Sequence, residues 1–101
     1  MDMLRFYVSE KQRHNDELLY EWLLQEAKLL GIPGGSAVRV IAGFGRHGRL
    51  HEETFFELGG ELTIQIEFVL SGEQADQLLE KLGSQQLNLF YLRHAVTTGV
   101  I

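Results

Sequence analysis

The sequence predicts an α+β fold, a ferredoxin-like β-α-β-β-α-β sandwich in which a four-stranded antiparallel sheet carries two helices on one face. Residues 3–10 and 61–70 alternate apolar and polar side chains, as strands with one buried face do. Two other segments, 15–31 and 72–83, repeat apolar residues at helical spacing. Residues 36–42 and 87–96 are two further short apolar segments. Together these elements follow the order of the split βαβ motif. We expect residues 1–101 to form a single domain, because 101 residues with 45% hydrophobic content support one core.

The first half of the chain is predicted to be a strand, a helix and a strand. Residues 3–10 form the first strand. Asn15 or Asp16 is expected to cap the helix, and Gly31 to end it. The buried face of this helix is expected to consist of Leu19, Leu23, Ala27 and Leu30. The short, β-branched segment 36–42 is predicted to be the second strand.

The second half is predicted to be a strand, a helix and a strand again. Residues 61–70 show the cleanest alternation in the chain, and one face of this strand is expected in the core. Ser71 or Gly72 is expected to start the helix that ends at Gly83. Residues 87–96 are predicted to be the fourth strand.

The face of the sheet that carries no helix is expected to pack against other subunits. Tyr7, Val69 and either Phe90 or Tyr91 leave this face half apolar. Packing identical subunits together is a common way to cover such a face.

Composition narrows the function. The net charge of −5 opposes general nucleic-acid binding, which depends on neutralised phosphates. No cysteine is present, no apolar run approaches the roughly 20 residues of a membrane span, and the start lacks a signal pattern. We therefore expect a cytoplasmic protein that is not embedded in a membrane. Several of the basic side chains nevertheless gather in residues 11–14 and 43–51.

Gly43, Gly45 and Gly48 reproduce the G-x-G-x-x-G spacing of dinucleotide-binding folds. That fingerprint requires a strand before it and a helix after it. Residues 36–42 supply the strand, but the segment after Gly48 lacks a clean helical stripe. Only about 50 residues follow, too few for the remaining units of a doubly wound sheet. The glycines therefore indicate a different structure, within a connection at residues 43–60 that is far longer than a hairpin loop.

The segments "FYVSEKQRH", "LYE" and "AVRVIAGFGRHGRLH", with the later strand "IQIEFV", resemble the short PII-like proteins, a family catalogued as a domain of unknown function. The resemblance covers nearly the whole chain. It implies a PII-like homotrimer that holds an adenine nucleotide in clefts between subunits. It also implies a regulatory role, in which the 43–60 loop contacts a transporter or an enzyme.

The candidate ligand-binding residues come from two loops. Glycine N–H groups and arginine side chains suit a phosphate, and Glu10 could contact a ribose hydroxyl or a cation. Because the first and third strands are neighbours in this fold, the two loops could share a site. The alternative is that the glycines only allow turns and the arginines are solvated. The candidates are Glu10, Arg13, His14, Gly43, Gly45, Arg46, His47, Gly48 and Arg49.

Histidines offer a second function, divalent metal binding by a trimer. His14, His47 and His51 have suitable imidazoles, and His47 and His51 are four residues apart. That spacing chelates a metal on a helix, and the intervening Gly48 disfavours a helix. No catalytic motif is present, so we expect neither an enzyme nor a bound cofactor.

Overall fold

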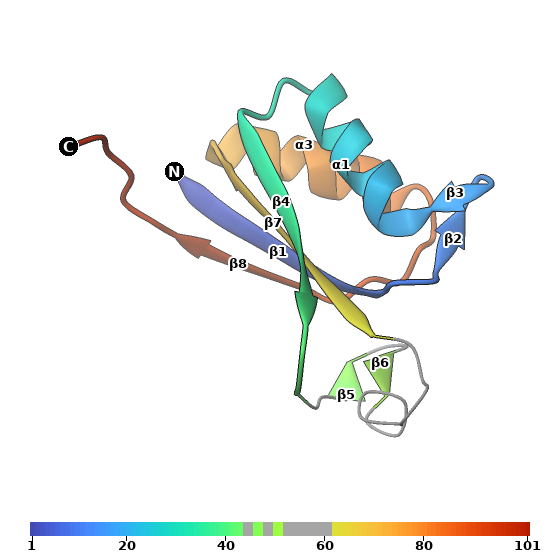
Figure 1. Cartoon of the computed structure of the whole chain (residues 1–101). Coiled ribbons are helices and arrows are strands. Elements are labelled where there is room, and N and C mark those ends of the chain that lie inside the picture. The colour runs from blue at the N-terminus through green and yellow to red at the C-terminus, as the bar shows by residue number, and fades with distance from the viewer. Residues whose placement is uncertain (44–45, 48–49, 52–61) are drawn as a thin grey trace.

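The computed structural model describes residues 1–43, 46–47, 50–51 and 62–101. One sheet organises these residues, and both long helices lie on the same side of it (Figure 1). Its strand order is β4-β7-β1-β8, and each neighbouring pair is antiparallel. The strands of the sheet and the two helices are, in chain order, β1 (Asp2–Ser9), α1 (Leu19–Leu29), β4 (Gly34–Val40), β7 (Thr63–Leu70), α3 (Gly72–Gly83) and β8 (Tyr91–Ala95). The predicted ferredoxin-like α+β fold is confirmed.

The core lies between the sheet and the helices. The central strands β1 and β7 supply alternate side chains to it, and the apolar faces of α1 and α3 cover them. The largest fully buried side chains are Phe6, Phe68, Leu4, Leu19, Leu23, Ile66, Leu70, Leu78 and Val8. The alternation predicted for residues 61–70 is therefore confirmed from Ile64 onward. Thr63 is buried although it lies on the polar side of the pattern, and Leu62 is exposed and precedes the strand.

The expected cap of the first helix is wrong. Asn15 and Asp16 instead form the turn of a small hairpin, β2 (Arg13–His14) and β3 (Glu17–Leu18). Both residues have positive φ values, 52° and 64°, as a two-residue type I′ turn requires, and Asn and Asp tolerate this conformation. Leu18 is the N-cap of α1 and makes no side-chain capping bond.

The other helix boundaries follow the predictions. Gly31, just after α1, has a φ of 78°, which glycine adopts without steric cost. Ser71 caps α3 with a reciprocal capping box: its Oγ accepts from the Gln74 N–H, and the Gln74 side chain accepts from the Ser71 N–H.

The bounds of β4 and β8 differ from the predictions. β4 starts at Gly34 and ends at Val40, two residues earlier than expected. β8 begins only at Tyr91, not at residue 87, because Gln86 and Asn88 have φ values of 56° and 57°. Left-handed residues interrupt an extended backbone, and neither periodicity nor propensity reveals them.

No helix in the described part of the chain is both long enough and apolar enough to cross a membrane.

Candidate functional site

The long connection between β4 and β7 is anchored at its base by Glu10, which follows β1. The Glu10 N–H donates to the Leu62 carbonyl oxygen at 2.8 Å, and the Leu62 N–H donates to Glu10 Oε1 at 3.4 Å. Arg39 at the end of β4 places both Nε and Nη2 3.2 Å from Glu10 Oε2. One carboxylate thus joins the ends of three strands. Glu10 was predicted as a ligand-binding residue, and in this arrangement both of its oxygens contact the chain itself.

Arg39 is a candidate site residue that was not predicted from the sequence. It is the single charged residue in the apolar strand segment "AVRVIA", and a charge at such a position is the sequence feature that could have marked it as a candidate. Its side chain is 59% exposed while that of Glu10 is 22% exposed. The guanidinium of Arg39 therefore remains accessible to solvent near the end of β4, where the connection begins, and can still donate hydrogen bonds to an anion.

Within the connection, the structure describes Gly43 and a short hairpin. Gly43 lies three residues beyond the end of β4. The hairpin consists of β5 (Arg46–His47) and β6 (Leu50–His51), in which Arg46 pairs with His51 and His47 with Leu50. The predicted site residues Gly45, Gly48 and Arg49 lie outside the described residues.

Histidine spacing in this hairpin bears on the metal alternative. His47 and His51 lie on strands rather than on a helix, and the register does not pair them with each other. The i, i+4 spacing therefore loses the helical geometry that would give it chelating value. In the described ranges, no three His, Asp or Glu residues gather as a metal site would require.

Arg13 and His14 lie elsewhere in the molecule. His14 Nε2 is 3.1 Å from Gln85 Oε1, just beyond α3, and its ring meets Trp22 of α1 edge-on with centroids 4.4 Å apart. Arg13 Nη2 donates to the Asp16 carbonyl oxygen at 2.7 Å, within the hairpin. Within one copy of the chain, the contacts of His14 thus hold the hairpin against the helices, while Glu10 is held at the loop base by Arg39.

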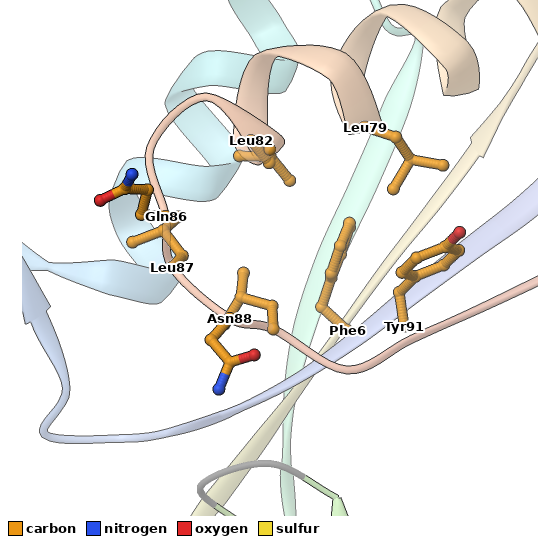
Figure 2. Close-up of a pocket in the computed structure, with 9 residues that line it drawn as sticks. Phe6, Leu79, Leu82, Gln86, Leu87, Asn88 and Tyr91 are labelled. Carbon is orange, nitrogen blue, oxygen red and sulfur yellow. The ribbon is translucent and has the colours of Figure 1, made fainter.

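A pocket of about 290 Å³ opens beside the segment that links α3 to β8 (Figure 2). Phe6, Leu79, Leu82 and Tyr91 form its apolar wall, and the left-handed residues Gln86 and Asn88 form part of its rim. The shape of the pocket depends on those two backbone conformations, so no pattern in the sequence predicted it.

The outer face of the sheet carries a polar cluster at its centre. Arg5 Nε and Nη2 both lie 2.6 Å from Glu67 Oε2, which also accepts from Gln65 Nε2 at 2.9 Å. Burial acts to lower the pKa of Arg5, but its hydrogen bonds and charge interactions with Glu67, and smaller ones with Tyr7, raise it overall. The positive charge of Arg5 is therefore balanced by Glu67, which lies opposite it on the neighbouring strand β7.

A second cluster fastens β8 to the rest of the fold. Arg93 donates to Asp76 Oδ1 at 2.7 Å, to Asp2 Oδ2 at 2.9 Å and to the Gly72 carbonyl oxygen at 3.1 Å. Hydrogen bonds to Asp76, and then to Asp2, raise the pKa of Arg93. These contacts join an edge strand, β1 and the start of α3, which indicates a structural role.

Comparison with known proteins agrees with this architecture. The family DUF190, described as Uncharacterized ACR, matches residues 1–97. The chain belongs to the DUF190 family. This DUF190 protein is 28% identical over 90 residues to a UPF0166 protein of Aquifex aeolicus, covering 89% of this chain and 86% of that one. It is 31% identical over 80 residues to a UPF0166 protein of Methanocaldococcus jannaschii, covering 79% and 73% of the two chains.

The DUF190 chain also resembles a solved structure. A crystal structure from Thermus thermophilus, provisionally described as a PII-like signaling protein, superposes with a TM-score of 0.58 and 20% identity. The match covers 92% of this chain and 81% of that one. At this identity the likeness establishes the fold, which confirms the predicted PII-like architecture.

Proposed function

We propose that this chain is a cytoplasmic, non-enzymatic PII-like regulator. It binds an adenine nucleotide, or an anion of similar charge, in the clefts between subunits of a homotrimer. Residues 43–60 pass the bound state on to a partner transporter or enzyme. The proposal includes Gly43, Gly45, Arg46, His47, Gly48 and Arg49 as the anion-binding positions, with Arg39 as an added cation at the loop base.

The observation that carries this proposal is the Glu10 anchor. An over-long connection in a small fold is usually functional. Here the connection begins and ends beside the contacts of Glu10 with Arg39 and Leu62, which join the ends of β1, β4 and β7. An anion that competes with Glu10 for Arg39 would alter that point directly. A ligand that prefers one arrangement of the connection shifts the population of the surface it presents to a partner.

The experiment is titration of ATP, ADP and AMP by calorimetry, with amide hydrogen exchange at residues 43–60 in the same samples. We expect Arg46→Ala to weaken nucleotide binding about ten- to a hundredfold, since a charge-assisted hydrogen bond contributes roughly 1.5–3 kcal/mol. Folding should be unchanged. Lys81→Ala is the matched control, because Lys81 is a partly exposed cation in the last turn of α3, where it pairs with Glu26 of α1.

Three results would contradict the proposal. Equal affinities in the wild type and Arg46→Ala would remove Arg46 from the site. Unchanged exchange of residues 43–60 at saturating nucleotide would leave the connection without a sensing role. If only zinc or nickel stabilises the protein, and replacing His47 and His51 abolishes that effect, the metal alternative replaces the nucleotide.

A further inference from the structure

The two edges of the sheet carry features that fit each other. Among the described strands, β4 forms one edge and β8 the other. β8 is exposed along its whole length, and the chain continues from it through residues 96–101. The Val96 N–H donates to the Met1 carbonyl oxygen at 3.0 Å, which extends the ladder with β1 by one bond. The residues that follow run out beyond the sheet (Figure 1).

This arm, residues 96–101, has the composition of a strand that pairs with another strand. Its sequence is "VTTGVI", five of its six residues are β-branched, and none is charged. Val100 and Ile101 are fully exposed. A segment that leaves its apolar side chains in water does not offset the entropy of its own ordering, so it needs a surface to pack on.

The opposite edge offers such a surface. A groove of about 390 Å³ runs beside the start of β4, and its apolar lining is Leu24, Ala27, Ile32, Pro33 and Phe68. Gly34 and Gly35 form its strand side, so no side chain screens the backbone there. β4 also lacks the lysine or proline that commonly blocks an edge strand, and Arg39 near its far end is engaged by Glu10.

We propose that residues 96–101 of one copy of this chain dock along the β4 edge of a second copy, with Val100 and Ile101 in the groove between α1 and β4. β7 and β1 separate the two edges of one sheet, so an arm that runs away from the sheet meets the β4 edge of another molecule. Strand addition supplies backbone hydrogen bonds, and the groove supplies apolar contacts. This inference rests on the self-association in the proposed function and does not depend on nucleotide.

The geometry of such an assembly is head-to-tail. The donor surface and the acceptor surface differ, so the interface is heterologous and forms a closed ring or an open filament, depending on the rotation between subunits. A ring of three copies would engage every arm and every groove.

The absence of cysteine makes the contact directly testable by cross-linking. Gly34→Cys and Val100→Cys are prepared as separate proteins, mixed, and treated with a short bismaleimide. A Cβ at Gly34 meets no atom within 4 Å, so that substitution leaves the fold intact. We expect cross-linked pairs in the mixture, and a covalent trimer from the double variant. Gly83→Cys mixed with Val100→Cys is the control, because a Cβ at Gly83 is equally free.

A second variant tests the apolar contact. Val100→Asp with Ile101→Asp should raise the concentration at which the assembly half dissociates at least tenfold, measured by native mass spectrometry. Gln25→Asp with Gln77→Asp adds the same charge at exposed helix positions and should have no such effect.

The possible outcomes separate the two proposals. If the wild type is a trimer, but the Gly34 and Gly83 mixtures cross-link equally or the aspartates leave assembly unchanged, arm docking is wrong and the trimer stands. A wild type that is monomeric at high concentration overturns both self-association and arm docking, while nucleotide binding is judged by calorimetry.

Discussion

Gly35 has no side chain, and the ring of Phe68 occupies the place where one would lie. A Cβ built at Gly35 would come within 2.6 Å of Phe68 Cδ1 and 2.7 Å of Cε1. Phe68 is only 1% exposed and packs in the core, so a shift of its ring disturbs the side chains around it. We expect Gly35→Ala to lower the free energy of unfolding by about 1–3 kcal/mol, as overpacking does.

Gly34→Ala is the matched control for this substitution. A Cβ at Gly34 meets no atom within 4 Å, so the change should lie within about 0.5 kcal/mol of the wild type. Urea denaturation of the three proteins measures the difference. Equal stabilities of Gly35→Ala and Gly34→Ala would show that the Phe68 ring adapts and that the close approach is not required.

At the scale of the element, the two long helices begin in different ways. α3 starts with the Ser71–Gln74 capping box, whereas α1 starts directly from the β2–β3 hairpin without a side-chain cap. We expect Ser71→Ala to cost about 1 kcal/mol of stability, because the Gln74 N–H loses Ser71 Oγ as its acceptor. Thermal or urea unfolding monitored by circular dichroism measures this loss.

Ser36→Ala provides the comparison for the cap. Ser36 is exposed on β4 and lies outside any helix terminus, so its replacement tests the loss of a hydroxyl by itself. A Ser71→Ala protein as stable as Ser36→Ala would mean that the capping box contributes little to α3.

At the scale of the whole molecule, the outer face of the sheet is the surface that no described helix covers. Val38 is 50% exposed there, opposite Gln65 in the register of β4 with β7. If identical subunits pack on this face, a charge at Val38 becomes buried without a partner. We expect Val38→Lys to lower the mass observed by light scattering at micromolar concentration, with an unchanged circular dichroism spectrum.

Leu29→Lys is the control for this prediction. Leu29 is also an exposed apolar residue, at 75%, but it lies on α1 on the other side of the sheet. The same mass for both variants would place the subunit interface away from the outer face.

The sequence alone determined the layers of this protein. The apolar pattern predicts which side chains are buried, through alternation in residues 3–10 and 61–70 and helical periodicity around Leu23 and Leu78. Burial of those side chains defines the sheet and its helices. The connection after the second strand was visible for the same reason, since it separates two clear strands. The resemblance of "AVRVIAGFGRHGRLH" to the PII-like proteins also pointed to the family that the comparison established.

Only the tertiary structure decided which distant residues meet. Glu10 and Arg39 are 29 residues apart, and His14 and Gln85 are 71 residues apart. Such pairs depend on sheet register and on where a hairpin folds back, and local pattern encodes neither. Asn15 and Asp16 illustrate the point, because a type I′ turn and a helix cap favour the same residues. The contacts of the hairpin with α1 and with Gln85 selected the turn, and those contacts exist only in the folded chain.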